Sequence, residues 1–215
     1  IEDVIIGCAF PEGEQGFNIG KLVTFLSDMH VKTAGTTINR WCGSSMEAIH
    51  IAAGKISMGS GKVFICGGVE SMTRVTAGFN PMPYPKSNKE NPNLYFSMGT
   101  TAENVAKKFQ ISREEQDNFA LRSQNKTQLA LEQNRFKDEL VKVNIDGNYL
   151  DIDEYPRKGL KIEDLRKLKT VFKENGTVTP GNASGINDGA AAVLLTSLEE
   201  AEKKSLKPIV RIVSW

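Results

Sequence analysis

Short apolar runs alternate with stretches of helical periodicity along the first third of the chain. Apolar and β-branched runs at Val4–Cys8, Gly35–Trp41 and Val63–Cys66 predict three buried strands. The apolar spacing between them, over Phe17–Met29 and Ser44–Met58, predicts two helices. A strand, a helix and a second strand within about 35 residues form a βαβ unit. We therefore expect an α/β core with a parallel sheet covered on both faces.

The pattern changes after residue 75. Thr76–Phe96 contains four prolines and no periodicity, which indicates a long loop. Thr100–Glu103 and Ser112–Glu115 read as capping boxes, so one helix is expected to start at each. The second helix is polar and runs to about Arg135. Residues 144–159 have turn composition with possible short strands.

Apolar segments return near the end of the chain. Ala190–Leu195 predicts a second buried run, Glu199–Lys204 a short helix and Pro208–Val213 a further strand. The expected fold is thus a layered α-β-α core with a mixed, largely parallel sheet, interrupted by a helical, loop-rich insertion. The expected core comprises residues 1–75 and 176–215, and the expected insertion comprises residues 76–175.

Composition restricts the class of protein. The 215 residues carry 27 Lys and Arg against 26 Asp and Glu, a net charge of +1, so no chain-wide basic field favours nucleic acid. The stretch Pro156–Asn175 nevertheless holds seven basic and three acidic residues. The chain contains no run of 18 apolar residues, so we expect no membrane-spanning helix. The chain opens at Ile1 without a Met or a signal pattern, and is expected to begin inside a domain.

Cysteine and histidine usage restricts the chemistry. The chain has three cysteines, Cys8, Cys42 and Cys66. This low and odd number argues against a secreted disulfide scaffold and favours a reducing compartment. No CxxC pair occurs, and only His30 and His50 could join a thiolate at a metal. We therefore expect no metal site.

Cys42 is the candidate nucleophile. It lies in I-N-R-W-C-G-S-S, between a predicted strand and a predicted helix, where α/β active sites gather. The free N–H groups and positive end of the following helix favour a thiolate there, and Gly43 permits a tight turn. The alternative is a small buried hydrophobe, and spacing alone leaves both readings open. Cys66, inside an apolar strand, and Cys8, at the end of one, are expected to be packing residues.

Neither histidine is a convincing base for Cys42. His50 lies eight residues further along the helix, about 12 Å away at the usual helical rise, and flanks its apolar face. His30 ends a predicted helix and is expected to be solvated. The base is therefore expected to be absent from this chain.

Five stretches lie in the order of the motifs of one enzyme family and resemble thiolases. The C-G-S-S-M and G-G-V-E-S-M strings look most like the 3-ketoacyl-CoA branch of fatty-acid β-oxidation, with the biosynthetic acetoacetyl-CoA branch as the close alternative. The five stretches are T-I-N-R-W-C-G-S-S-M-E-A-I-H (Thr37–His50), F-I-C-G-G-V-E-S-M-T (Phe64–Thr73), M-G-T-T-A-E-N-V-A (Met98–Ala106), I-S-R-E-E-Q-D-N-F-A-L-R-S (Ile111–Ser123) and G-T-V-T-P-G-N-A-S-G-I-N-D-G-A-A-A (Gly176–Ala192).

The resemblance implies an acyltransferase that cleaves 3-ketoacyl-CoA with CoA to give acetyl-CoA and a shortened acyl-CoA. Cys42 matches the nucleophile that becomes acylated, and its backbone N–H would stabilise an oxyanion. CoA and acyl-CoA are then substrates, and no cofactor or metal is implied.

The insertion resembles the loop domain that holds CoA in this family. Ser184 in N-A-S-G matches a residue that contacts the pantetheine arm, with Ala183 and Gly185 allowing close approach. Met98 matches a residue that lines the pantetheine tunnel, although ordinary core packing is an equal alternative. Arg157 aligns with a basic residue near the adenosine phosphates, although a solvated charge run is the alternative.

Three other polar residues near the motifs are expected to be structural. Asn187 and Asp188 are expected to fix a turn, and Glu70 is expected to form structural hydrogen bonds.

The sequence also departs from the family. The strings N-E-A-F, G-H-P and C-G-G-G of the second thiolase half are absent, as are the first strand and helix before Ile1. We therefore expect an internal piece, inactive alone, of a protein that forms dimers or tetramers. Such a protein is expected in the cytoplasm, or in the mitochondrial matrix of a eukaryote, and could join a β-oxidation multienzyme assembly.

Three other readings remain open. One is a non-catalytic protein that binds CoA esters, and another is a self-assembly module that acts through the Thr76–Phe96 loop. A condensing enzyme of fatty-acid synthesis has a related fold, but it fits the Met98–Ala106 and Asn182–Ala192 strings poorly.

Overall fold

A computed structural model describes residues 1–75 and 84–214. The chain forms two compact units, Ile1–Met82 with Ile186–Trp215, and Pro83–Gly185. The sequence placed residues 176–185 with the α/β core, whereas the structure groups them with the second unit. Hydrogen bonds to two helices of that unit hold this segment. Glu103 accepts one from the Thr177 N–H, and Asp117 accepts one from the Asn182 side chain.

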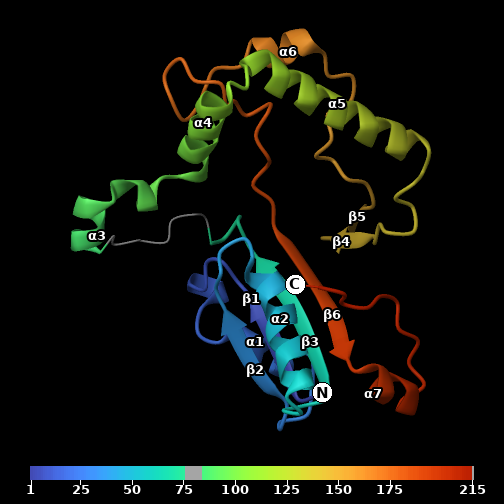
Figure 1. The fold of residues 1–215 in the computed structure, drawn as a ribbon. Coiled ribbons are helices and arrows are strands. Elements are labelled where there is room, and N and C mark those ends of the chain that lie inside the picture. The colour runs from blue at the N-terminus through green and yellow to red at the C-terminus, as the bar shows by residue number, and fades with distance from the viewer. Residues whose placement is uncertain (76–83, 215) are drawn as a thin grey trace. The chain divides into compact units, whose positions relative to one another are not determined.

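The first unit is built on a four-stranded mixed sheet in the order β2-β1-β3-β6 (Figure 1). The strand β1 (Asp3–Gly7) lies parallel to β2 (Ala34–Ile38) and to β3 (Val63–Glu70). The last strand, β6 (Gly189–Thr196), pairs antiparallel with β3, with Glu70 opposite Gly189. The expected α/β fold with a largely parallel, mixed sheet is confirmed.

Two helices cover opposite faces of this sheet. Ile5 of β1 packs with Ala48 and Ala52 of α2 (Ser44–Ser57), and the core cluster is completed by Phe64 and Cys66. The other face of the sheet is covered by α1 (Ile19–Leu26). Gly35 of β2 lies on this face, because a Cβ atom there would meet the backbone of Lys21. A 3-10 turn (η1, Gly13–Gln15) precedes α1, and α7 (Leu198–Lys203) follows β6.

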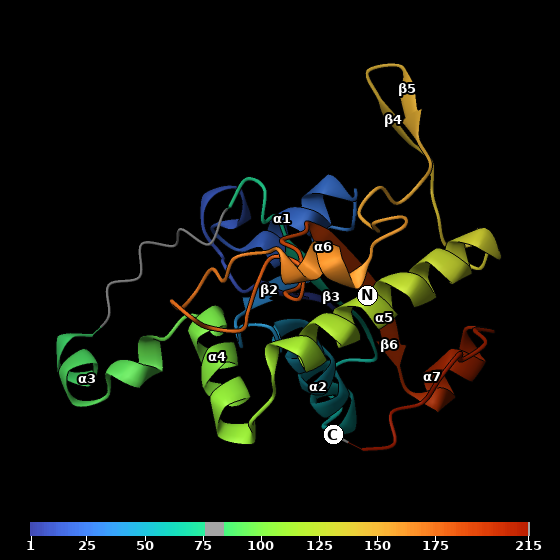
Figure 2. The same ribbon diagram turned by 90° about the horizontal axis from the view of Figure 1, so that it is seen from above.

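The second unit is mainly helical. Its long helix α5 (Arg113–Glu132) begins at the predicted Ser112–Glu115 capping box, which is confirmed. Figure 2 shows the hairpin of β4 and β5 extending away from the helices of this unit, and all six of its strand residues are exposed. The other elements are α3 (Pro85–Glu90), η2 (Pro92–Tyr95), α4 (Met98–Phe109), β4 (Val143–Ile145), β5 (Asn148–Leu150) and α6 (Ile162–Arg166).

The helix α4 starts two residues before the predicted capping box. Its N-cap is Ser97, whose side chain accepts a hydrogen bond from the N–H of Thr100. The Thr100–Glu103 capping box is therefore wrong. The Glu103 carboxylate accepts hydrogen bonds from the N–H groups of Thr177 and Val178 instead, since a backbone N–H withdrawn from water, as at the buried Val178, needs an acceptor.

Three further expectations differ from the structure. Ala190–Leu195 forms a strand as expected, but most of β6 is exposed rather than buried, and β3 is its one partner among the described strands. Pro208–Val213 is not a strand, since no described strand pairs with it. Part of the expected Thr76–Phe96 loop is helical, as α3 and η2, and residues 76–83 lie outside the described residues.

No helix in the described part of the chain has the length and apolar character needed to cross a membrane.

Candidate functional site

Cys42 lies on the turn between β2 and α2, and it is the one exposed cysteine of the three. The N-cap of α2 is Gly43, which has no side chain to cap the helix. The hydroxyl of Ser44 stabilises the preceding turn instead, donating to the Trp41 carbonyl at 2.5 Å and accepting from the Arg40 N–H at 2.8 Å. The thiol therefore precedes the helix N-terminus on a turn fixed by side-chain hydrogen bonds.

The residue before Cys42 has an unusual backbone conformation. Trp41 has a φ of 48°, in the left-handed region that bulky side chains rarely adopt. Asn39 supports this conformation, because its Oδ1 accepts a hydrogen bond from the Trp41 N–H at 2.8 Å. The Nδ2 of Asn39 donates to the Ala9 carbonyl at 3.0 Å, and the Phe10 ring packs edge-on against the Trp41 ring, with centroids 5.6 Å apart.

The loop after β1 is held from its other side by Glu70. The Glu70 carboxylate accepts hydrogen bonds from the N–H groups of Ala9 at 2.8 Å and Phe10 at 3.1 Å. The Nε2 of Gln15 donates to it at 2.9 Å, and the Oε1 of Gln15 accepts from the Ser71 N–H. The structural role expected for Glu70 is confirmed, since it joins the end of β3 to the loop that supports Cys42.

A cavity of about 680 Å³ lies beside Cys42, within the first unit. Two glycines allow the first turn of α2 to reach the strand ends that border this cavity. A Cβ atom at Gly7 would lie 2.3 Å from the Ser45 nitrogen, and one at Gly68 would lie 2.7 Å from the Ser45 Cβ. The lining includes Phe10, Trp41, Cys42, Ser45, Met46 and Gly68.

The other two cysteines are packing residues, as expected. Cys8 and Cys66 are each 1% exposed. Burial, followed by the nearby Glu70 carboxylate, raises the pKa of Cys8 to about 11. Burial, followed by the charge of Asp3, raises the pKa of Cys66 to about 11. Burial therefore disfavours the thiolate, the nucleophilic form, at both positions.

The two histidines contact other groups. The Nδ1 of His50 lies 3.9 Å from the Glu47 carboxylate one turn earlier in α2. The Nδ1 of His30 accepts a hydrogen bond from the Lys32 N–H at 3.1 Å. Within the described ranges, no group of three or more His, Cys, Asp or Glu side chains is arranged to hold a metal ion.

The other candidate residues all lie in the second unit. Ser184 and Gly185 are exposed, and Ala183 is partly buried. Met98 is 71% exposed at the start of α4, so it does not pack in a core. Arg157 is exposed, and its backbone N–H donates to the side chain of Gln124 on α5 at 2.9 Å.

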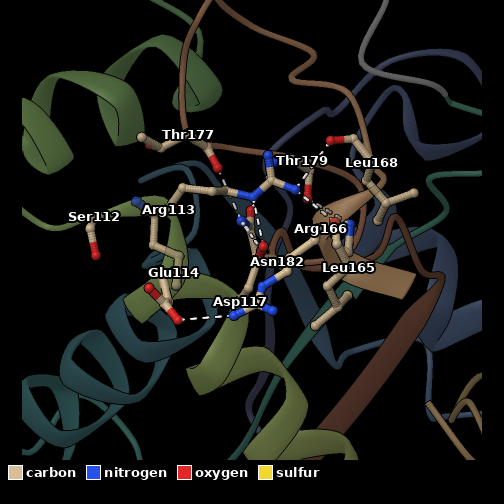
Figure 3. Close-up of polar contacts among 12 residues, drawn as sticks. Ser112, Arg113, Glu114, Asp117, Leu165, Arg166, Leu168, Thr177, Thr179 and Asn182 are labelled. Atoms are coloured by element: carbon tan, nitrogen blue, oxygen red, sulfur yellow. Dashed lines mark hydrogen bonds and ion pairs between the residues drawn. The ribbon is translucent and has the colours of Figure 1, made fainter. Parts of the chain in front are cut away.

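The sequence pattern does not predict a polar network around the buried Asp117 carboxylate of the second unit (Figure 3). The Asp117 carboxylate on α5 accepts hydrogen bonds from Arg113 at 2.8 Å and from the Asn182 side chain at 2.9 Å. Asn182 directly precedes Ala183 and Ser184. The available signal was weak, because an Arg and an Asp four residues apart on a polar helix usually form a surface pair.

Comparisons with known proteins agree on one family. A sequence model of the thiolase N-terminal domain matches residues 1–199. A β-ketoadipyl-CoA thiolase of Acinetobacter baylyi is 41% identical over a 236-residue alignment, which covers 100% of this chain and 59% of that protein. A 3-ketoacyl-CoA thiolase of Bacillus subtilis is 39% identical, and an acetyl-CoA acetyltransferase of Shinella zoogloeoides is 38% identical, with the same coverage.

A solved structure shares the fold. The crystal structure of human mitochondrial 3-ketoacyl-CoA thiolase in complex with CoA matches with a TM-score of 0.81 and 32% identity. The match covers 96% of this chain and 56% of the human one. The chain thus spans well under two thirds of the length of the relatives it matches.

Proposed function

Because the chain belongs to the thiolase family, we propose that it is the nucleophile-bearing part of an acyltransferase that cleaves 3-ketoacyl-CoA with CoA. The observation that carries this proposal is the exposed Cys42 thiol, which precedes the N-terminus of a 14-residue helix and lines a cavity of about 680 Å³. A helix N-terminus favours negative charge, both on a thiolate and on a neighbouring oxyanion.

The proposed reaction has two steps. The Cys42 thiolate attacks the 3-keto carbon, and the bond between carbons 2 and 3 breaks. The electron pair of that bond and one proton go to carbon 2, which leaves as acetyl-CoA. The thiolate of a second CoA then attacks the acyl-cysteine thioester, forms the shortened acyl-CoA and releases Cys42 as the thiolate.

The protein contributes position and charge stabilisation to both steps. We assign the Cys42 backbone N–H to the tetrahedral oxyanion, since it lies where the free N–H groups of α2 begin. His30 and His50 contact Lys32 and Glu47, so we propose that the base comes from a part of the protein outside these 215 residues.

We assign CoA binding to the second unit. Ser184 contacts the pantetheine arm, Ala183 and Gly185 let the chain approach that arm, and Met98 borders it. These assignments are supported by the N-A-S-G match and by the exposure of Ser184, Gly185 and Met98. Arg157 meets the adenosine phosphates, supported by its exposure in a stretch with four excess positive charges. This assignment needs no cofactor or metal, because CoA itself is the substrate.

The substrate branch and the surroundings of the protein are also part of this proposal. The C-G-S-S-M and G-G-V-E-S-M strings favour the β-oxidation branch, and the acetyl-CoA acetyltransferase relative keeps acetoacetyl-CoA as the alternative substrate. The whole protein would act in the cytoplasm or the mitochondrial matrix, as a dimer or tetramer, with a β-oxidation multienzyme as a candidate partner.

Acylation by acetyl-CoA tests the chemistry directly. The 215-residue chain is incubated with acetyl-CoA and analysed by peptide mass spectrometry. We expect an acetyl group on the peptide containing Cys42, none after Cys42→Ser, and undiminished labelling after Cys66→Ser. Equal labelling of the wild type and Cys42→Ser would contradict the assignment of the nucleophile. A thiolysis assay with acetoacetyl-CoA and CoA tests the base, because steady turnover by this chain alone would show that its base lies within it.

A further inference from the structure

Two buried carboxylates hold the segment that leads to Ser184. Glu103 of α4 is 5% exposed, and Asp117 of α5 is 1% exposed. The Glu103 oxygens accept hydrogen bonds from the N–H groups of Thr177 and Val178 at 2.8 Å each. Buried carboxylates are costly unless they are fully hydrogen-bonded, so both are specific features of this unit.

Asp117 connects this segment to a second helix. Its Oδ2 accepts from the Arg113 Nε at 2.8 Å, one turn earlier on α5. One terminal nitrogen of Arg113 donates to the carbonyls of Leu165 at 2.7 Å and Leu168 at 3.1 Å, at the end of α6. Figure 3 shows these groups converging around the Arg113 guanidinium. The position of the Asp117 carboxylate is therefore fixed from both α5 and α6.

Asn182 links the Asp117 carboxylate to the turn formed by residues 177–183. Its Nδ2 donates to the Asp117 Oδ1 at 2.9 Å and to the Thr177 carbonyl at 3.0 Å. Its Oδ1 accepts from the Thr179 N–H at 2.8 Å, and the Thr179 carbonyl accepts from the Ala183 N–H at 3.0 Å. The side chain of Asn182 thus bonds the turn at two points and α5 at a third, and the chain leaves the turn at Ala183.

The next residue is Ser184, whose side chain faces solvent while the preceding turn is held from inside. A ligand that contacts a preordered segment does not lose the entropy of ordering it, so preorganisation increases affinity. On the basis of the proposed function, we propose that Asp117 and Asn182 are positioning residues for CoA, because they fix the Ala183–Gly185 segment against which the pantetheine arm binds. Neither residue touches CoA in this proposal.

The test measures binding of three probes to the 215-residue chain by calorimetry. The probes are CoA, 4′-phosphopantetheine and adenosine 3′,5′-bisphosphate, the last lacking the pantetheine arm. We expect Asn182→Ala and Asp117→Asn to weaken binding of CoA and 4′-phosphopantetheine at least tenfold, and binding of adenosine 3′,5′-bisphosphate less than twofold. This split distinguishes positioning from general loosening of the unit, which would weaken all three.

The matched control is Glu114→Gln, on the same helix. Glu114 also pairs with an arginine, Arg166, at 3.0 Å, but both side chains are more than half exposed. We expect its affinity for all three probes to stay within twofold of wild type. Should Asp117→Asn not fold, as judged by circular dichroism, Asn182→Ala decides the question, because it keeps the Arg113–Asp117 pair.

Each outcome has a distinct meaning. Unchanged affinity for CoA and 4′-phosphopantetheine in folded Asn182→Ala overturns the positioning role and leaves the proposed function intact. Equal weakening of all three probes also overturns the positioning role. Absence of CoA binding to the wild-type chain overturns both this proposal and the assignment of CoA binding to the second unit.

Discussion

Asn39 accepts a hydrogen bond from the backbone N–H of Trp41, the residue directly before Cys42. Because Trp41 has a left-handed φ of 48°, this bond supports a conformation that a bulky residue adopts at a cost. We expect Asn39→Ala to destabilise the chain by about 1–3 kcal/mol and to slow acetylation of Cys42 by acetyl-CoA. Chemical denaturation and the rate of acetyl labelling measure the two effects.

The control for this substitution is Asn144→Ala. Asn144 also accepts a backbone hydrogen bond, from Gly147 at 2.9 Å, but in the exposed β4–β5 hairpin. We expect it to leave Cys42 acetylation unchanged. Equal acetylation rates in wild type and Asn39→Ala would show that the Trp41 turn does not position Cys42.

Cys42 is expected to be the one cysteine of the three that iodoacetamide alkylates in the folded chain. The thiolate is the reactive form, and burial raises the pKa of Cys8 and of Cys66 to about 11, which favours the thiol form at pH 8. We expect alkylation of Cys42 alone in the folded chain, and of all three cysteines in guanidinium, as measured by peptide mass spectrometry. Alkylation of Cys66 in the folded chain at a rate similar to that of Cys42 would contradict the burial described above.

Glu103 is expected to make stability depend on acid pH. Burial acts to raise the pKa of this carboxyl, but the hydrogen bonds from Val178 and Thr177 outweigh it and hold the pKa below the usual 4.5. A pKa lowered in the folded state gives a stabilisation that is complete above 4.5 and lost as the pH falls through the folded pKa. The free energy of unfolding should therefore decrease as the pH falls below about 4.5.

Two variants test the contribution of Glu103. Glu103→Gln should lower stability at pH 7 by about 1–3 kcal/mol, because an amide cannot accept all of these hydrogen bonds. It should also reduce the loss of stability below pH 4.5. Glu163→Gln, at an exposed position of the same unit, should leave the acid dependence unchanged. An identical acid profile in wild type and Glu103→Gln would exclude Glu103 as its source.

Gly7 is expected to tolerate no side chain. A Cβ there would lie 2.3 Å from the Ser45 nitrogen, so Gly7→Ala must push α2 away from β1, at a cost of about 1–3 kcal/mol or more. Gly54→Ala is the matched control, since a Cβ there meets no atom within 4 Å, and alanine favours the helix by about 0.5–1 kcal/mol. Thermal unfolding should therefore shift in opposite directions for the two variants.

The sequence predicted the elements whose signals are local. The periodicity of Ser44–Met58 predicted α2, and the Ser112–Glu115 box predicted the start of α5, because helix caps and amphipathic spacing act within a few residues. The hydrophobic pattern of one segment could not predict which strand that segment would pair with. Pro208–Val213 has strand-like composition, but a strand needs a neighbour to pair with, and none of the described strands provides one.

The candidate site was predictable in the same uneven way. The place of Cys42 before a helix was predictable because the strand, the motif and the helix spacing around it are all visible in the sequence. The contact between Asp117 and Asn182 joins residues 65 positions apart, and the role of Glu103 joins residues 74 and 75 positions apart. Such contacts arise only when the helices are packed, so no window of sequence contains them.

The pairing of Glu70 with Gly189 has a consequence for modularity. The 118 residues between them leave and re-enter the sheet at directly opposed positions of adjacent antiparallel strands. The Asp188 carboxylate accepts a hydrogen bond from the Thr73 N–H at 2.8 Å. This bond joins the segment that leaves the sheet to the segment that returns to it, in line with the turn-fixing role expected of Asp188. In the strand register, the whole second unit thus occupies the place of a hairpin turn. A two-residue turn grafted between Glu70 and Gly189 is expected to keep every pair of the β3–β6 register, so this unit can vary in size without changing that register.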